Sequence, residues 1–574
     1  MQMKLKLSSI SLLALVLGVS SCSDSFLDQE PDERVKITNE KQVAQLLATA
    51  YPEGDYGWMC EISTDNYIDN NCPHLPSKPN VDQIEDHYNL SAYSGTMDDE
   101  LFRFEPVKSY TGKDSPSSVW LYCYAAIAVA NQALEHIEEL VAQNGGEYTN
   151  SLRRSRAEAL LCRAYSHFLL VNLFSQTWKD DELSKKDIGI PYVTKPETTV
   201  KPMYDRSNVY ETYQLIEKDM LEGLKDVGDE TYEMPKWHFN TKAAHAFAAR
   251  FYLYKREWAK VVEHADIVLG KDSLETAQQL QRYDGFDNCT SSEDYAVQWQ
   301  SSSNPNNLML MVTYALRWRR LAGYRYACAG LAIQAINYHT GPNWSWYRIP
   351  SAAVSGASYY RSKADYGYMW AKCAERFEYT NKVAGTGQAH AIRREFTATE
   401  LLLSRAEAKL MLGDKEGCLK DLFTYDASRW TFSDANTKFY RNNNSLKDLT
   451  LTLFENYYKP QNVMHFNCFQ NWDFTQQISP SYVVTADQVT CMNAINDMRR
   501  YETAYDGQRF FDMRRWGMEV THEVGLNKEK ITVSATDPRR AFELPAEVIA
   551  AGLEPTRPHD SSQDKQLMDY DRAY

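Results

Sequence analysis

The chain has 574 residues and a formal net charge of −15. It has no block of lysine and arginine residues, and phosphate binding needs clustered positive charge, so nucleic acid is excluded as an expected partner. After residue 22 no segment approaches 18 consecutive apolar residues, so no membrane-spanning helix is expected there.

The first 22 residues have the order of a secretory signal peptide. Lys4 and Lys6 form a short basic region, residues 10–19 form an apolar run, and small residues lead into Cys22. The run is too short for a bilayer, which needs about 20 residues. A cysteine directly after small residues resembles the lipobox of a bacterial lipoprotein, which implies cleavage after residue 21 and acylation of Cys22 with palmitate-type chains. The alternative is an ordinary secreted protein with a cysteine near its cleavage site by chance.

Helical periodicity dominates the rest of the sequence. Apolar residues spaced by three and four predict helices around residues 120–134, 157–171 and 210–224, the last capped by Ser207 or Asn208. Two helical hairpins follow, and their predicted helices are 241–254 with 258–269, and 397–412 with 415–423. Short turns and small residues at the contacts are typical of tetratricopeptide hairpins. The predicted fold class is mostly α, with tetratricopeptide-like helical hairpins supporting a loop-rich variable face.

Two long tracts, residues 51–112 and 283–394, lack a sustained helical pattern apart from a short helix expected at 330–338. Tracts of this length inside a compact protein are usually functional. Their aromatic rings are candidates to form an apolar platform for a ligand, while neighbouring Asp and Asn side chains bind its polar groups. The candidate ligand-binding residues are Trp344, Trp346, Tyr347, Trp58, Asp65, Asn66, Tyr67 and Tyr93. The alternative is that these rings hold the loops against the body.

The sequence contains no H-E-x-x-H, G-x-S-x-G or phosphate-loop motif, so the chain is not expected to be an enzyme, although its carboxylates leave a glycosidase pair open. No cofactor or metal is expected. Calcium is a weaker hypothesis for two groups of oxygen ligands, where capping Asx turns are favoured. These groups are residues 65–71 and the cluster Asp284, Asp287, Asn288, Glu293 and Asp294. The 11 cysteines include no C-x-x-C pair, and most are expected to be buried hydrophobic residues, with Cys60 and Cys72 as the closest pair.

An ordered set of motifs resembles the SusD/RagB family of outer-membrane nutrient-binding lipoproteins. Four stretches match its helical motifs, at residues 120–131, 156–174, 242–258 and 405–408. The most specific stretch, Arg499 to Gly517, looks like the family signature E-x3-E-G-x-R-x-x-D-L-R-R-W, with Asp506 in place of the second Glu. Leu544-Pro545 and Glu547 resemble the closing L-P-I-P-x-x-E segment without its second proline. The two loop tracts match nothing, and the usual Asn-Pro-Gly-Tyr ending is absent.

This resemblance implies a lipid-anchored protein of the cell outer membrane that faces the exterior. It implies binding of oligosaccharide or polysaccharide and its delivery to a SusC-like TonB-dependent transporter. Asp24, Asp28 and Glu30, close behind the anchor, also resemble the surface-export signal of such lipoproteins. The alternatives are a RagB-like peptide-binding protein, a ligand-free scaffold or lid for the transporter, and an anchored hydrolase.

The expected layout is a signal peptide (1–21) followed by one SusD-like domain (22–574). The domain divides into an N-terminal segment and first helix (22–50), a variable loop tract (51–112), a helical core (113–282), a ligand-face tract (283–394) and a C-terminal part (395–574) with a signature helix at 499–517. The charged and aromatic residues of this signature are expected to lock the terminal helix to the body through ion pairs. They are Arg499, Arg500, Glu502, Arg509, Asp512, Arg514, Arg515 and Trp516.

Overall fold

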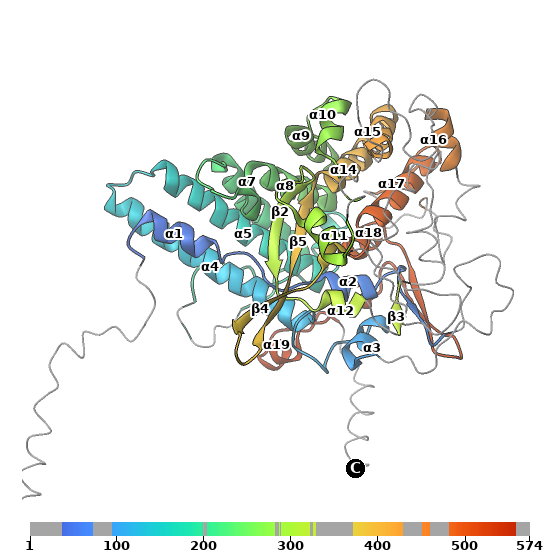
Figure 1. Ribbon diagram of the computed structural model, residues 1–574, viewed down its shortest axis with the longest axis horizontal. Coiled ribbons are helices and arrows are strands. Elements are labelled where there is room, and N and C mark those ends of the chain that lie inside the picture. Colours follow the sequence, from blue (N-terminus) through green and yellow to red (C-terminus); the bar gives the residue numbers. More distant parts are fainter. Residues whose placement is uncertain are drawn as a thin grey trace, which may run out of the picture.

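The computed structural model describes residues 37–72, 94–197, 199, 204–281, 286, 289–321, 325–328, 371–428, 451–459, 474 and 482–557. These residues form a mostly helical protein with three small sheets, as the periodicity predicts. Figure 1 places the long helices of the N-terminal half on one side and the C-terminal helices on the other, with the largest sheet between them.

The long helices pack in sequential pairs. They are α4 (Pro116–Gln143), α5 (Asn150–Phe174), α7 (Val209–Asp226), α8 (Thr241–Lys255), α9 (Trp258–Leu269), α14 (Ala398–Met411) and α15 (Lys415–Ser428). α4 packs on α5, α5 on α7, α8 on α9, and α14 on α15. Side-chain caps begin most of them, including the predicted cap Asn208, which accepts from the backbone N–H of Glu211. The tetratricopeptide-like hairpins are therefore confirmed.

The other helices connect and cover these pairs. They are α1 (Glu40–Leu47), α2 (Gly57–Ile62), α3 (Thr96–Phe102), α6 (Asp181–Ser184), α10 (Ser273–Gln279), α11 (Ser292–Gln300), α12 (Arg317–Leu321), α16 (Leu451–Tyr457), α17 (Val489–Glu502), α18 (Gln508–Arg515) and α19 (Ala546–Ala550). Among the residues that the structure describes, no helix has both the length and the apolar character needed to cross a bilayer.

The largest sheet has the strand order β2-β5-β4, with both pairs antiparallel. The strands are β2 (Asn307–Thr313), β4 (Arg376–Asn381) and β5 (Thr386–Thr397), and two small sheets pair β1 (Ile68–Asp69) with β3 (Tyr326–Ala327) and β6 (Val520–Val524) with β7 (Glu529–Val533). The prediction of a loop-rich tract without a sustained helical pattern at residues 283–394 is wrong for this sheet, for β3 and for α11 and α12. A capping box between Ser291 and Asp294 begins α11, and its S-x-x-D pattern is visible in the sequence.

The predicted signature helix at 499–517 is divided into α17 and α18. Tyr505 and Gly507 between them have positive φ angles of 68° and 83°, a backbone conformation that ends a helix. The break lets the turn approach α2, because a Cβ on Gly507 would lie 3.0 Å from the Cα of Gly57. Glu61 of α2 accepts the backbone N–H of Gly507 at 2.8 Å, which fixes the turn against that helix.

Candidate functional site

The signature residues of α17 and α18 form a buried ion network. The two carboxylate oxygens of Asp512 accept Nε of Arg499 at 2.8 Å and Nε of Arg515 at 2.9 Å. Arg515 also donates to Glu407 of α14, which accepts Nε1 of Trp516 at 3.1 Å. Burial raises the pKa of Asp512, but the two arginines lower it more, so the pKa of this carboxyl lies below its usual range. The network therefore joins α14, α17 and α18.

Asp65 and Asn66, two candidate ligand-binding residues, are internal partners of this signature. Arg509 holds Asp65 in a two-point contact, with Nε at 3.0 Å and Nη2 at 2.9 Å from the carboxylate oxygens. Arg500 Nε donates to Asn66 Oδ1 at 2.7 Å. Because these hydrogen-bonding groups are used inside the protein, the prediction that Asp65 and Asn66 contact a ligand is corrected to a structural role.

The remaining signature residues also face inward. Arg514 donates to the backbone carbonyls of Asn172 and Ser175 at the end of α5. Glu502 accepts the hydroxyl of Tyr425 at 3.4 Å. All eight signature side chains are buried, so they connect the C-terminal helices to the helical core.

Trp58 and Tyr67 are buried side chains with exposed fractions of 1% and 2%. Their rings meet edge to face with centroids 5.7 Å apart, and Trp58 Nε1 donates to Asp98 at 2.8 Å. A ring enclosed in this way offers no face to a sugar. The proline-rich surroundings suggested a displayed loop, but the short helix α2 carries Trp58 into the core, so its prediction and that of Tyr67 are corrected.

Five predicted site residues lie outside the described residues. They are the lipidation residue Cys22 and the aromatic residues Tyr93, Trp344, Trp346 and Tyr347. The predicted helix at 330–338 and the calcium-cluster residues Asp284, Asp287 and Asn288 lie outside them as well.

Three carboxylates proposed for calcium, Asp65, Asp69 and Asp294, are engaged by protein groups. Asp69 is held by Arg325 through two contacts of 3.0 Å, and it accepts the backbone N–H of Asn71 in the expected Asx turn. Asp294 caps α11. Within the described ranges, no three His, Cys, Asp or Glu side chains are grouped to hold a metal ion. Cys60 and Cys72 are both buried and are not disulfide-bonded within those ranges.

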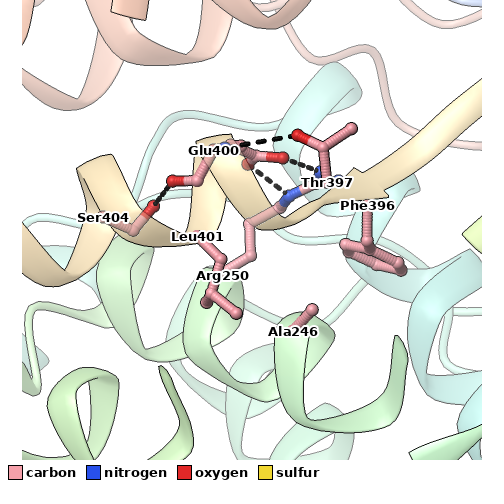
Figure 2. Close-up of a pocket in the computed structure, with 7 residues that line it drawn as sticks. All are labelled: Ala246, Arg250, Phe396, Thr397, Glu400, Leu401 and Ser404. Carbon is pink, nitrogen blue, oxygen red and sulfur yellow. Dashed lines mark hydrogen bonds and ion pairs between the residues drawn. The ribbon is translucent and has the colours of Figure 1, made fainter. Parts of the chain in front are cut away.

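A small pocket between α8 and α14 is lined by Ala246, Arg250, Phe396, Thr397, Glu400, Leu401 and Ser404 (Figure 2). Arg250 crosses it, donates to both carboxylate oxygens of Glu400 at 2.9 and 2.6 Å, and lies 4.3 Å from the centroid of the Phe396 ring. The pocket has room for about one water molecule, so it suits a packing role and not a glycan.

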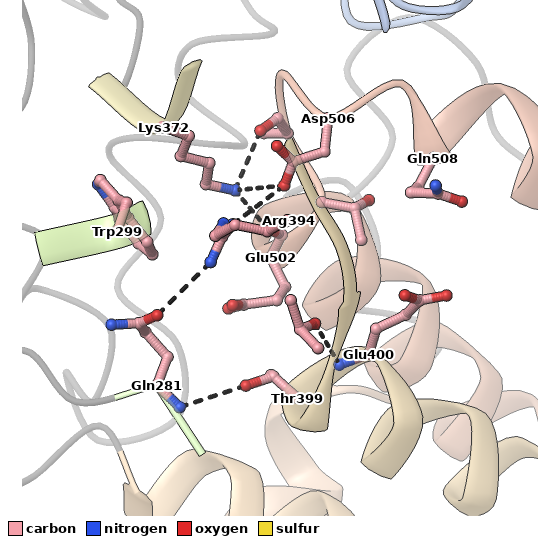
Figure 3. A network of polar contacts seen from close by, with 12 residues as sticks. Gln281, Trp299, Lys372, Arg394, Thr399, Glu400, Glu502, Asp506 and Gln508 are labelled. Atoms are coloured by element: carbon pink, nitrogen blue, oxygen red, sulfur yellow. Dashed lines mark hydrogen bonds and ion pairs between the residues drawn. The ribbon is translucent and has the colours of Figure 1, made fainter. Parts of the chain in front are cut away.

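A second polar cluster joins the sheet to the turn between α17 and α18 (Figure 3). Asp506 accepts Nζ of Lys372 at 3.3 Å and Nη2 of Arg394 at 3.1 Å, and the guanidinium of Arg394 lies 4.7 Å from the centroid of the Trp299 ring. Burial raises the pKa of Asp506, but Lys372 and Arg394 lower it below its usual value. The aspartate at which the chain departs from the family signature therefore binds β5 and the short turn before β4 to the terminal helices.

A half-buried aromatic pair was not predicted from the sequence. Tyr122 of α4 and Tyr314, directly after β2, are half-buried, with ring centroids 5.7 Å apart and planes inclined by 41°. Unlike many tyrosines of this protein, neither donates its hydroxyl to a described residue. The sequence did carry a signal for Tyr122, because it lies two positions from Trp120, which is buried, and from Tyr124, which is partly buried, and therefore on another face of the helix.

Comparisons with known proteins agree with the helical fold. A family model described as starch-binding associating with outer membrane matches residues 25–253, and the model of the SusD family matches residues 334–546. None of the curated protein sequences matches the chain.

Solved structures similar to this chain include three SusD superfamily proteins. One from Bacteroides vulgatus is 14% identical with a TM-score of 0.57, and the match covers 92% of this chain and 100% of the other. One from Bacteroides fragilis is 15% identical with a TM-score of 0.55 and coverages of 89% and 96%. One from Bacteroides thetaiotaomicron is 17% identical with a TM-score of 0.53 and coverages of 91% and 100%. With two non-overlapping family matches and this shared fold, the chain belongs to the SusD/RagB family.

Proposed function

We propose that this protein is an outer-membrane lipoprotein that binds oligosaccharide or polysaccharide at the cell surface and delivers it to a SusC-like TonB-dependent transporter. The observation that carries the proposal is the match of residues 25–253 to a family described as starch-binding and associated with the outer membrane. The helical framework supports it, because its ion networks are internal and leave the loop tracts to provide specificity.

Anchoring is the first part of the proposal. Cys22 follows an apolar run and small residues, and several acyl chains on one residue give a stable anchor because each buried methylene adds about 0.8 kcal/mol. Cys22→Ala should move the protein from washed membranes to the soluble fraction and abolish labelling by a palmitate analogue. Retention of Cys22→Ala in the membranes with unchanged labelling would refute the lipoprotein assignment. Surface exposure is tested separately, by degradation with external protease on intact cells.

Binding without catalysis is the second part. The purified mature protein is titrated by calorimetry against a polysaccharide panel of starch, laminarin, xylan, mannan and pectin, and each mixture is assayed for new reducing ends. Heat of binding without reducing-end release supports the proposal. Release would support an anchored hydrolase, and the absence of both would support a ligand-free scaffold.

Two further measurements address a peptide ligand and the delivery step. A mixture of tryptic peptides replaces the polysaccharides in the same titration, and binding of peptides alone would favour a RagB-like role. Delivery is tested by measuring uptake of the bound glycan into cells that lack the SusC-like transporter. Uptake that needs this protein but no transporter would contradict the delivery step.

The loop aromatics are our proposal for the main ligand contacts. Trp344, Trp346 and Tyr347 follow Gly341 and Pro342, a context that favours display on a loop. Tyr93 in the other tract is proposed alongside them. Alanine substitution at these positions should reduce the heat of binding in the same titration without lowering the melting temperature.

A further inference from the structure

Tyr122 and Tyr314 form an aromatic surface whose polar groups are unoccupied. Both hydroxyl groups lack a hydrogen-bond partner among the described residues, although tyrosine hydroxyls elsewhere in the protein commonly have carboxylate or carbonyl partners. A half-exposed ring with an unused hydroxyl is suited to ligand binding, because it supplies an apolar face and a polar edge together. The two rings lie 192 positions apart in the sequence and are brought together by the fold.

One acidic and one basic side chain accompany the two rings. We call this group, Tyr122, Tyr314, Glu53 and Lys113, the tyrosine platform. The backbone places Glu53 beside Tyr314, because the N–H of Tyr314 donates to the Glu53 carbonyl at 2.8 Å, and the charge of Glu53 contributes to raising the pKa of Tyr314. No described residue donates a hydrogen bond to this carboxylate. Lys113 Nζ lies 5.6 Å from the centroid of Tyr314 and donates to the backbone carbonyl of Ala389 at 3.0 Å.

The backbone holds the tyrosine platform rigidly. The N–H of Tyr314 donates to the carbonyl of Glu53 at 2.8 Å, and Gly54 pairs with Tyr314 in a parallel bridge. Gly54 is required for close packing, since a Cβ there would lie 2.9 Å from the Cα of Val119 and 3.3 Å from the Cβ of Tyr122. The backbone that carries both rings is therefore in place before a ligand arrives, which limits the conformational entropy lost on binding.

We infer that the tyrosine platform is a glycan subsite that binds a neutral hexose-based chain, a conclusion that rests on the carbohydrate-binding function proposed above. Sugar rings stack through their C–H faces on the tyrosines. Vicinal hydroxyl groups donate to the Glu53 carboxylate, and a ring or hydroxyl oxygen accepts from Lys113. Tyr122 belongs to the N-terminal part of α4 and Lys113 contacts Ala389 of β5, so the subsite lies where the start of α4 approaches the β4–β5 hairpin, two elements that Figure 1 shows.

The charges of the platform favour a neutral ligand. Glu53 and Lys113 carry opposite charges, and Glu378 adds a second negative charge that acts on Tyr314, so an anionic ligand gains no net attraction from these side chains. An acidic sugar would place its carboxylate near Glu53 on a chain whose formal net charge is −15. A neutral chain avoids this repulsion and still uses Glu53 and Lys113 as hydrogen-bonding groups.

The test compares platform variants of the mature protein by calorimetry. The probes are maltohexaose, cellohexaose, laminarihexaose, xylohexaose and mannohexaose, with hexagalacturonate as the acidic probe and a tryptic peptide mixture as the peptide probe. Wild-type protein should bind at least one neutral hexasaccharide. Replacing both tyrosines (Tyr122→Ala with Tyr314→Ala) should weaken that binding about 30-fold, the loss expected for an aromatic anchor.

Matched variants separate stacking from folding. Tyr148→Ala removes a half-buried tyrosine beyond the C-terminal end of α4, at the opposite end of that helix from the platform, and should leave the affinity unchanged. Tyr122→Phe and Tyr314→Phe keep the rings and should lose less affinity than the alanine variants. Glu53→Gln should weaken binding of the neutral hexasaccharide without affecting the melting temperature.

Each outcome decides one claim. Suppose that wild-type protein binds a neutral hexasaccharide and that the folded double alanine variant binds it equally well. The subsite is then refuted, while the proposed function stands. The same conclusion follows if the phenylalanine variants and Glu53→Gln all bind as well as wild type. If wild-type protein binds hexagalacturonate alone, the neutral class is refuted. If it binds peptides alone or nothing, the carbohydrate function fails and the subsite fails with it.

Discussion

Replacing Asp512 by asparagine is predicted to destabilise the fold. The wild-type carboxylate accepts Arg499 and Arg515, and all three side chains are at most 3% exposed. Removing one partner of a buried ion pair costs about 3–5 kcal/mol, because the other charge stays buried without compensation. The cost should lie at the low end, about 3 kcal/mol, since Arg515 keeps Glu407 and Arg499 keeps Ser404 Oγ at 3.0 Å.

The assay is urea unfolding of wild-type and Asp512→Asn protein, followed by circular dichroism at neutral pH. The control is Glu230→Ala, which breaks the exposed pair with Arg154 and should leave the midpoint nearly unchanged. The pKa of Asp512 is depressed in the folded state, so its contribution is present above the ordinary value of 3.8 and is lost as the pH falls through the folded value. An Asp512→Asn midpoint equal to that of wild type, or a difference that grows towards low pH, would refute the reasoning.

The remaining predictions test other parts of the framework. Burial raises the pKa of Glu61 from 4.5 to about 7. Between pH 4.5 and about pH 7 the folded protein therefore keeps a proton on Glu61 that the unfolded chain loses. The contribution of Glu61 to the free energy of unfolding falls as the pH rises through this range. Glu61→Gln should therefore melt higher than wild type at about pH 8 but not at about pH 4, and equal gains at both would contradict this pKa. Gly507→Ala places a side chain at φ 83° and should cost at least about 1 kcal/mol; an unchanged melting temperature would show that the turn can relax. Alanine at Trp344, Trp346 and Tyr347 should weaken glycan binding about 30-fold without changing the melting temperature, and the opposite pattern would assign these rings to packing.

The long helices were predictable because their signals are local. Apolar spacing and caps such as Asn208 lie within one or two turns of each other, so the start and end of α7 and α9 follow from neighbouring residues. The family motif also placed arginines and carboxylates on the same stretch. Its break at Gly507 was less visible, because the reason for the break is contact with α2, which lies far away in the sequence.

The candidate site was less predictable because its partners are distant. Asp65 is paired with Arg509, 444 positions along the chain, and no local pattern indicates that pairing. Without knowledge of that pairing, the sequence around Asp65 and the neighbouring aromatic residues predicts an open loop that binds sugar. Tyr314 gave no helical signal at all, and only the packing of Gly54 against α4 brings its ring to Tyr122.

The buried ion pairs also determine which charges a ligand meets. Each pair, such as Arg499 with Asp512 or Arg509 with Asp65, removes one positive and one negative charge from the surface, so pairing does not change the net charge of −15. The guanidinium groups of Arg499 and Arg509, which could otherwise bind an acidic ligand, are thus already occupied. Affinity for a neutral hexasaccharide should be nearly constant between about 50 and 500 mM sodium chloride, whereas any weak binding of hexagalacturonate should strengthen as salt screens the repulsion. A tenfold loss of neutral-glycan affinity over that range would show that an unpaired charge on the protein dominates binding, which contradicts recognition through stacking and neutral hydroxyl contacts.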